Sequence, residues 1–158
     1  MRQIIILVLV GTLALVLTPP TAVSADQVFH SKRLSFSLTA AGEVAGHPEV
    51  RSAHVVDIHP NGPVNGAFER YLINGAASET SYRVILQVFN GGCEGEFLFP
   101  LQTTTLTTNA QGNAHGKVAF TPQDLAPFSG LVFGVQWTLV DEDGVRAYET
   151  PCIVVAVD

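Results

Sequence analysis

The sequence predicts an all-β protein, an antiparallel two-sheet β-sandwich of immunoglobulin-like type with about seven or eight strands and one disulfide. Three observations predict this class. Short segments rich in Val, Ile, Phe, Leu and Thr alternate with Gly, Asn and Pro turn signals. No long segment has the apolar period of an amphipathic helix. The chain also contains two cysteines, Cys93 and Cys152.

The N-terminal segment predicts a secretory signal peptide at residues 1–25. Arg2 precedes an uncharged, mostly apolar run of 14 residues from Ile4 to Leu17, and Val23-Ser24-Ala25 has the small residues that signal peptidase accepts. The run is shorter than the roughly 18 to 20 residues that a membrane-spanning helix needs. We therefore expect cleavage after Ala25, a single domain at 26–158, and a secreted or periplasmic location.

The charge balance excludes two classes of partner. Removal of the signal peptide leaves seven Lys and Arg against fourteen Asp and Glu, a net charge of −7. Only Lys32 and Arg33 are adjacent, whereas a nucleic-acid-binding surface needs clustered basic residues that displace counterions from phosphates. The same balance disfavours binding to anionic lipid. We expect no nucleic-acid partner and no membrane span after signal cleavage.

The first half of the mature chain contains four predicted strands, which cover 34–38, 50–58, 67–73 and 82–88. In the first and fourth, apolar residues alternate with polar ones, which is the period of a half-buried strand. A loop at 42–48 follows the first strand. Pro60-Asn61-Gly62-Pro63 ends the second strand, because proline cannot donate a hydrogen bond to a strand ladder.

The second half predicts further strands at 97–105, 118–120, 131–139 and 153–157. Pro100 interrupts the first of these, so we expect an edge strand or a bulged strand. Thr121-Pro122-Gln123-Asp124 predicts a single helical turn, and Asp143-Gly144 predicts a hairpin turn. The segment 131–139 has the cleanest alternation, and Trp137 is in phase with its apolar neighbours, which predicts a core position.

The two cysteines, Cys93 and Cys152, are predicted to form a disulfide, because the protein is expected to fold outside the reducing cytosol. The bridge would join the C-terminal strand to the middle of the fold. On the chain-entropy model it contributes roughly 4 kcal/mol of stability. A catalytic or redox-active thiol is the alternative, which the absence of a Cys-x-x-Cys motif disfavours.

A metal site is the main functional alternative to a plain binding domain. His54 and His59 flank Val55-Val56-Asp57-Ile58, and histidine-rich segments of exported proteins bind copper or zinc. Side chains alternate across a strand, so Asp57 and His59 share one face and His54 lies on the other. Asp57 and His59 would need a third ligand, which the remaining histidines supply as candidates: His30, His47 and His115.

Two acidic segments have a functional and a structural interpretation. The Asp141-Glu142-Asp143-Gly144 loop could bind calcium, but the EF-hand pattern is missing and acidic hairpin tips are common. Glu94 and Glu96 share one face of an expected strand and could act as a carboxylate pair. We favour a plain turn for the first segment and a charged, pairing-resistant edge strand for the second.

One stretch resembles a known family. Ser78-Glu79-Thr80-Ser81-Tyr82-Arg83-Val84, continuing to Val88-Phe89-Asn90-Gly91-Gly92, is similar to the Thr-x-Tyr-x-Val strand and following turn of fibronectin type III domains. That family has little more than one strand after this motif and lacks the paired cysteines. The resemblance implies a sandwich and carries no function.

The function predicted first is that of a secreted, non-catalytic module that binds through its surface, with a cell-envelope, adhesion or ligand-binding role. Nucleophile elbow, zinc-binding, phosphate-loop and dinucleotide motifs are absent, so an enzyme is the weaker hypothesis and no cofactor is expected. The alternative is a small exported metalloprotein or metalloenzyme that uses Asp57 and His59, and a secreted inhibitor ranks third. The expected partner is an extracellular protein or a small ligand, bound by the loops at 42–48 and 60–66.

Overall fold

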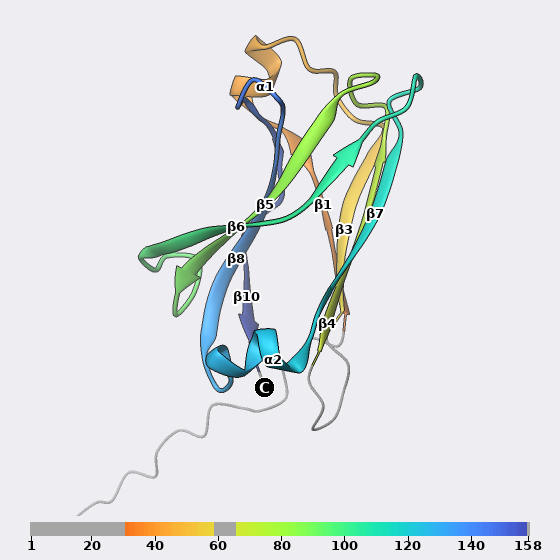
Figure 1. Ribbon diagram of the computed structural model, residues 1–158. Helices are drawn as coiled ribbons and strands as arrows, with labels where there is room; N and C mark the ends of the chain where they lie inside the picture. The colour runs from red at the N-terminus through yellow and green to blue at the C-terminus, as the bar shows by residue number, and fades with distance from the viewer. Residues whose placement is uncertain (1–30, 59–65, 158) are drawn as a thin grey trace, which may run out of the picture.

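The computed structural model describes residues 31–58 and 66–157, which form a sandwich of two antiparallel sheets (Figure 1). The predicted two-sheet β-sandwich is thus confirmed. The four-stranded sheet has the order β1-β3-β4-β7. Its strands are β1 (Ser31–Ser35), β3 (Ser52–Ile58), β4 (Ala67–Asn74) and β7 (Ala114–Phe120).

The six-stranded sheet has the order β2-β9-β8-β5-β6, with β10 also paired to β8. Its strands are β2 (Ser37–Leu38), β5 (Ser81–Asn90), β6 (Phe97–Thr107), β8 (Val132–Val140), β9 (Arg146–Glu149) and β10 (Ile153–Ala156). As predicted, β6 is an edge strand, and its pairing with β5 contains two register shifts. The two sheets diverge toward the end of the sandwich where α2 lies (Figure 1).

The first predicted strand, at 34–38, is divided between the two sheets. β1 pairs with β3 in one sheet, and β2 pairs with β9 in the other. Phe36 lies at the crossing point, where its side chain is buried and its backbone N–H donates to the Ala53 carbonyl at 3.0 Å. The prediction of one continuous strand was therefore wrong, because alternation reports which side chains face inward and not which sheet the backbone joins.

The predicted loop at 42–48 begins as a short helix, α1 (Ala40–Val44). Thr39 caps it by accepting a hydrogen bond from the Gly42 backbone N–H at 2.9 Å. Gly42 packs directly on β9, since a Cβ atom there would lie only 2.4 Å from the Ala147 carbonyl oxygen. The segment is therefore held against the sandwich rather than projecting from it.

The C-terminal strand pairing is interrupted. β9 and β10 both pair with β8, and Pro151 lies between them. Thr150 bridges the gap, because its N–H donates to the Trp137 carbonyl at 3.0 Å and its hydroxyl accepts from the Trp137 N–H at 3.1 Å. The predicted strand at 153–157 is thus confirmed as β10, and the hairpin predicted at Asp143-Gly144 joins β8 to β9, which the sequence did not separate from β10.

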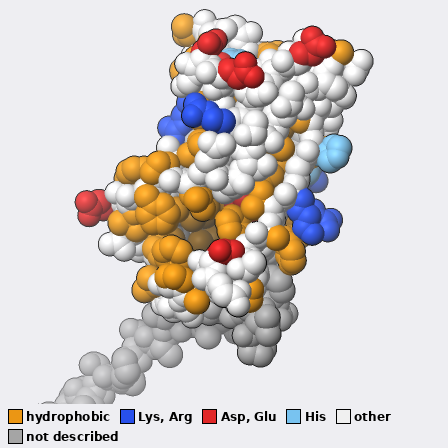
Figure 2. All heavy atoms as spheres, in the orientation of Figure 1, with side chains coloured by type: hydrophobic (Ala, Val, Ile, Leu, Met, Phe, Trp, Pro, Cys, Tyr) orange, Lys and Arg blue, Asp and Glu red, His pale blue; other side chains and the backbone are white. Residues whose placement is uncertain are grey.

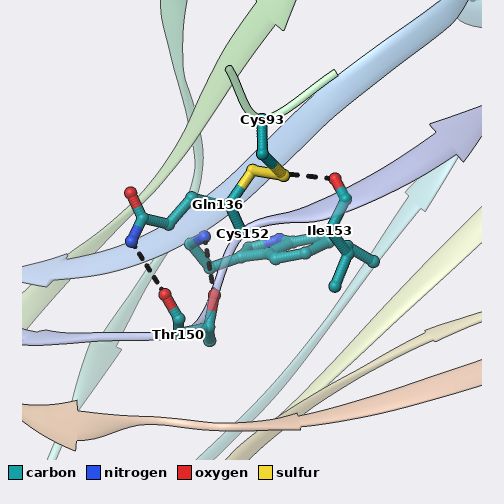
Figure 3. Close-up of a disulfide and its surroundings, with 6 residues drawn as sticks. Cys93, Gln136, Thr150, Cys152 and Ile153 are labelled. Atoms are coloured by element: carbon teal, nitrogen blue, oxygen red, sulfur yellow. Dashed lines mark hydrogen bonds between the residues drawn. A yellow bond between two sulfur atoms is a disulfide. The ribbon is translucent and has the colours of Figure 1, made fainter.

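The structure contains the predicted disulfide between Cys93 and Cys152, whose Cα atoms are 5.8 Å apart (Figure 3). The bridge joins the turn between β5 and β6 to the start of β10, so both ends belong to the six-stranded sheet. Next to it, the Gln136 side chain donates to the Thr150 carbonyl at 2.8 Å (Figure 3). The disulfide thus holds the β5–β6 turn against the interrupted C-terminal strand.

Two helical turns cover the end of the sandwich: α2 (Pro122–Leu125) and a 3₁₀ turn, η1 (Ala126–Phe128). The predicted turn at Thr121–Asp124 is confirmed as α2 with a capping box. The Asp124 carboxylate accepts hydrogen bonds from the Thr121 backbone and hydroxyl, both at 2.7 Å, and these bonds lower the pKa of Asp124. η1 places Phe128 against the core between the sheets.

Candidate functional site

A cavity of about 500 Å³ lies between the two sheets at the end covered by α2 and η1. We call it the intersheet cavity. Its lining is predominantly apolar and comes from both sheets and both helical turns: Asp57, Ala67, Glu69, Leu86, Val88, Phe99, Leu101, Phe120, Asp124, Leu125, Phe128, Phe133, Val135, Trp137, Val155 and Val157. The volume is in the range of natural small-molecule sites.

The intersheet cavity opens to the surface beside the edge strand β6. Phe99 and Leu101 of β6 line the cavity and yet remain 37% and 41% exposed. Figure 2 shows hydrophobic side chains gathered around a hollow on this face of the molecule. Other large apolar side chains are also exposed in β6, β8, β10 and the segment before β8: Phe97, Leu98, Leu131, Val132 and Val154. Exposed apolar side chains beside a cavity, such as Phe99 and Leu101, are typical of binding sites.

Strand alternation explains the apolar wall of the cavity. In β8, Phe133, Val135 and Trp137 are consecutive inward-facing residues, and all three line the cavity. In β10, Val155 faces inward, whereas its neighbour Val154 is 45% exposed on the outer face. The regular alternation thus produces a continuous hydrophobic surface on the six-stranded sheet.

The opposite wall contains a buried carboxylate, Glu69 of β4, which is 2% exposed. Its Oε1 accepts a hydrogen bond from the Trp137 indole Nε1–H at 2.9 Å, and its Oε2 accepts one from the Tyr71 hydroxyl. The Tyr71 hydroxyl also lies 2.9 Å from the Thr103 hydroxyl. These contacts connect the two sheets through polar groups inside an otherwise apolar core.

The hydrogen bonds at Glu69 define its role as an acceptor. Burial raises the pKa of the Tyr71 hydroxyl, and the negative charge of Glu69 raises it further. Tyr71 therefore stays protonated at physiological pH and can only donate to the carboxylate. The Trp137 indole is also a donor only. The two donors hold the Glu69 carboxylate in one position in the cavity wall.

A second buried carboxylate, Asp57 of β3, lies next to Glu69. Asp57 is 5% exposed, it lines the intersheet cavity, and it is the direct cross-strand partner of Glu69. On its other side, Asp57 pairs in register with Lys32 of β1. Lys32, Asp57 and Glu69 thus form one row across three strands, because directly opposite residues of an antiparallel pair point to the same face.

The metal site at Asp57 and His59 remains a prediction. Asp57 is in the cavity wall, but His59 and the candidate third ligand His30 lie outside the described residues. Of the other two candidate ligands, His47 contacts Asp141, and His115 is an exposed residue of β7 whose cross-strand partner Leu72 lies opposite His54. Within 31–58 and 66–157, no group of three or more His, Cys, Asp or Glu residues is arranged to hold a metal ion.

His54 lies on the outer face of β3, as its position opposite to Asp57 predicts. Its Nδ1 is 3.1 Å from the Arg33 guanidinium of the neighbouring strand β1. Partial burial lowers the pKa of His54, and the positive charge of Arg33 lowers it further. His54 therefore belongs to the outer surface of the four-stranded sheet and not to the intersheet cavity.

His47 belongs to a polar cluster at the opposite end of the sandwich. Its Nε2 is 2.8 Å from the Asp141 carboxylate and its Nδ1 is 3.1 Å from the Tyr82 hydroxyl. The Tyr148 ring packs edge-on against His47 and Tyr82, and its hydroxyl donates to the Pro48 carbonyl at 2.8 Å. These contacts fix the segment 42–48, which the sequence predicted to be a recognition loop.

Asp141 has a structural role in this cluster. Burial acts to raise the pKa of Asp141, but hydrogen bonds from His47 and from the Val145 backbone N–H at 2.7 Å outweigh it and lower the pKa. Asp141 thus closes the β8–β9 turn and fixes His47. Glu142 and Asp143 remain exposed on the turn.

Asp141→Asn is expected to lower the free energy of unfolding at pH 7 by about 2 kcal/mol, because hydrogen bonds to a charged acceptor are stronger than those to a neutral one. Because folding depresses the pKa of Asp141, its contribution is present above the unfolded-state value of 3.8 and is lost as the pH falls through the lower folded-state value. Thermal unfolding of both proteins between pH 7 and pH 2 measures this.

The difference in Tm between wild type and Asp141→Asn should therefore shrink below pH 3.8. Asp143→Asn is the matched control, since Asp143 is an exposed residue of the same turn. A Tm difference that stays constant down to pH 2 would show that the ionised Asp141 carboxylate does not stabilise the fold.

Glu94 and Glu96 do not form the expected pair on one strand face. β6 begins at Phe97, so both residues precede it in the turn that the disulfide holds, and both are exposed. The turn is closed by a hydrogen bond from the Asn90 N–H to the Glu96 carbonyl at 2.9 Å. The prediction was wrong because Gly91 and Gly92, which adopt positive φ angles, allow a longer turn than the strand pattern indicated.

Glu69 and Tyr71 were not predicted as site residues from the sequence. A signal was present, because Glu69 occupies an inward-facing position of the predicted strand, between the apolar positions Ala67 and Tyr71. An acidic residue at such a position is seldom buried without a specific partner. Its partner Trp137 lies 68 residues away in the chain, so no local pattern connects the two.

Comparison of this chain with models of protein families, with curated proteins and with solved structures finds no match. In the part of the chain that the structure describes, none of the helices has the length and apolar character required to cross a membrane. Inference about function therefore depends on the geometry of the intersheet cavity.

Proposed function

We propose that this protein is an exported, non-catalytic binding protein that holds an apolar small molecule between its two sheets. The observation that carries the proposal is the intersheet cavity of about 500 Å³, lined by hydrophobic side chains and open beside β6. Natural ligand sites are concave, mostly apolar and contain a few well-placed polar groups. The cavity has these features, with Glu69 and Asp57 as the polar groups.

Export is supported by the signal-peptide pattern of residues 1–25, which lie outside the described residues. The boundary of one domain at 26–158 and the immunoglobulin-like character of the sandwich also remain predictions. The disulfide agrees with an oxidising compartment, where such bonds form and persist. The signal-peptide pattern, the disulfide and the apolar cavity together favour an extracellular or periplasmic carrier for a poorly soluble ligand.

Val155→Phe is expected to weaken binding of the neutral apolar probe 1-N-phenylnaphthylamine by about tenfold or more, because the larger side chain occupies part of the cavity. Val154→Phe is the matched control, since Val154 is the adjacent residue of β10 and faces outward. Energy transfer from Trp137, the chain's one tryptophan, to the bound probe measures the affinity, and the comparison of the two variants locates the probe.

Equal affinities of Val155→Phe and wild type would place the probe on the outer apolar surface and contradict the proposal. Absence of probe binding to the wild-type protein would also contradict it. Circular dichroism and thermal unfolding of both variants establish that each is folded before the titrations are compared.

A further inference from the structure

We propose that the outer face of the four-stranded sheet binds a linear polysaccharide that carries carboxylates, such as a polymer of uronic acids. The binding groups are three basic side chains, Arg33 of β1, Arg70 of β4 and Lys117 of β7, which we call the basic row. This face is on the other side of the sheet from the intersheet cavity. The inference is therefore independent of the small-molecule site.

Strand register brings the basic row together from three distant parts of the chain. Arg33 pairs with Val56, which pairs with Arg70 on its other side. Arg70 in turn pairs with Lys117. Directly opposite residues point to the same face, so the three basic side chains share the outer face, and all three are exposed. The sequence alone does not reveal this cluster, because its members are far apart in the chain.

Among the described residues of β1, β3, β4 and β7, no acidic side chain faces outward. The two acidic residues of these strands line the intersheet cavity instead. The Lys117 ammonium lies 4.5 Å from the centre of the Phe68 ring, and the Arg33 guanidinium lies 3.1 Å from His54 Nδ1. Figure 2 shows Lys, Arg and His side chains along the edge of the molecule where β7 lies. The face is thus basic on a chain whose net charge is negative.

Arg70 and Lys117 are direct cross-strand partners with the same charge. Like charges at directly opposite positions destabilise a sheet. A carboxylate of a bound polymer between the two side chains reduces this repulsion and accepts charge-assisted hydrogen bonds from both. The planar guanidinium of Arg70 also matches the geometry of a carboxylate. This pair is therefore the centre of the proposed site.

The basic row has the dimensions of a site for an extended chain. Neighbouring strands lie about 4.8 Å apart, so the three spacings from β1 to β7 separate the backbones of Arg33 and Lys117 by about 14 Å. A polymer with repeated carboxylates contacts the row at more than one point, which strengthens binding relative to a single small anion. Ser35 and His115 lie in the neighbouring outward row and provide hydrogen-bonding groups for sugar hydroxyls.

Two other polyanions fit this face less well. Proteins that bind nucleic acid on a sheet stack bases on exposed aromatic side chains. Phe68 is the one outward-facing Phe, Tyr or Trp in these four strands, and the Lys117 ammonium lies over its ring. Recognition of anionic lipid takes clusters of four to eight basic residues, whereas this row has three. The carboxylated polysaccharide requires neither feature.

The experiment measures binding of the purified protein to immobilised polygalacturonate by biolayer interferometry at pH 7.5 and low ionic strength. Arg70→Gln should weaken binding about fivefold, and the double variant Arg70→Gln/Lys117→Gln should weaken it about twentyfold. Arg83→Gln is the matched control and should stay within about twofold of wild type. Arg83 is likewise an exposed strand arginine, but it belongs to β5 of the other sheet. Higher ionic strength should weaken binding of the wild-type protein.

The variants are expected to fold, because both substituted residues are exposed, and thermal unfolding checks this. Equal affinities of Arg70→Gln and wild type, or an equal loss in Arg83→Gln, would overturn the role of the basic row. Absence of wild-type binding to polygalacturonate would overturn the proposal. Equal or stronger binding to poly-L-glutamate, or to vesicles of phosphatidylglycerol, would also overturn it and would identify an acidic polypeptide or a membrane as the partner.

One further variant separates this inference from the proposed small-molecule function. Val155→Phe changes the intersheet cavity and leaves the outer face of the four-stranded sheet unaltered. It should therefore bind polygalacturonate with the affinity of the wild-type protein. A loss of polysaccharide binding in Val155→Phe would show that the polymer binds at the cavity and would overturn the proposed surface.

Discussion

Replacement of Cys93 and Cys152 together by serine should lower the free energy of unfolding by about 4 kcal/mol, because the bridge removes the entropy of a loop that spans 59 residues of the unfolded chain. The bridge also holds the β5–β6 turn on β8. A Cβ atom at Gly134 would lie only 2.5 Å from the Gly92 backbone, so these two segments are in direct contact. Urea unfolding of wild type and of the double variant measures the loss.

The double substitution is preferable to a single one, because it leaves no free thiol that could form a disulfide between molecules. The wild-type protein unfolded in the presence of dithiothreitol is the control, and it should give the same midpoint as the double variant. An unchanged urea midpoint in the double variant would show that the bridge does not contribute to stability. The expected loss is a large part of the 5 to 15 kcal/mol that is typical of a folded domain.

Glu69→Ala should lower the free energy of unfolding by about 2 to 4 kcal/mol, because it removes the acceptor of two buried donors, the Trp137 indole and the Tyr71 hydroxyl. Glu69→Gln is the matched comparison, since its amide oxygen can accept one of the two hydrogen bonds and should therefore cause a smaller loss. Urea unfolding, followed by the fluorescence of Trp137, measures both variants.

A free energy of unfolding for Glu69→Ala within about 0.5 kcal/mol of wild type would show that water replaces the carboxylate at both donors. An increase in stability would show instead that the buried charge itself costs more than its hydrogen bonds contribute, as happens for some buried ion pairs. Either result would contradict the expected structural role.

Strand positions and inward faces were well predicted because alternation is a local property. The segment 131–139 predicted β8 to within one residue, and Trp137 is 1% exposed, as its phase with the apolar neighbours indicated. Pro100 correctly predicted that β6 lies at a sheet edge, since proline removes a donor from the ladder. The segment Thr121–Asp124 likewise predicted the helical turn α2, and the structure shows that this turn has a capping box.

The errors occurred where contacts with distant segments override the local pattern. The strand at 34–38 crosses between sheets at Phe36, because β3 and β9 offer partners on opposite sides of the core. The segment 42–48 was predicted to be an irregular loop, but it begins within α1, and Asp141 and Tyr82 hold His47 from 94 and 35 residues away. No sequence window contains both members of such pairs.

The sequence by itself determined the fold class, the disulfide between Cys93 and Cys152, and the faces on which most strand residues lie. These properties follow from residue type and local spacing, which require no knowledge of the partner strand. Only the tertiary structure decided which inward faces meet, and therefore that Glu69 contacts Trp137 and lies beside Asp57. The intersheet cavity exists because two sheets diverge around these side chains, and this separation is a property of the assembled sandwich that no single segment encodes.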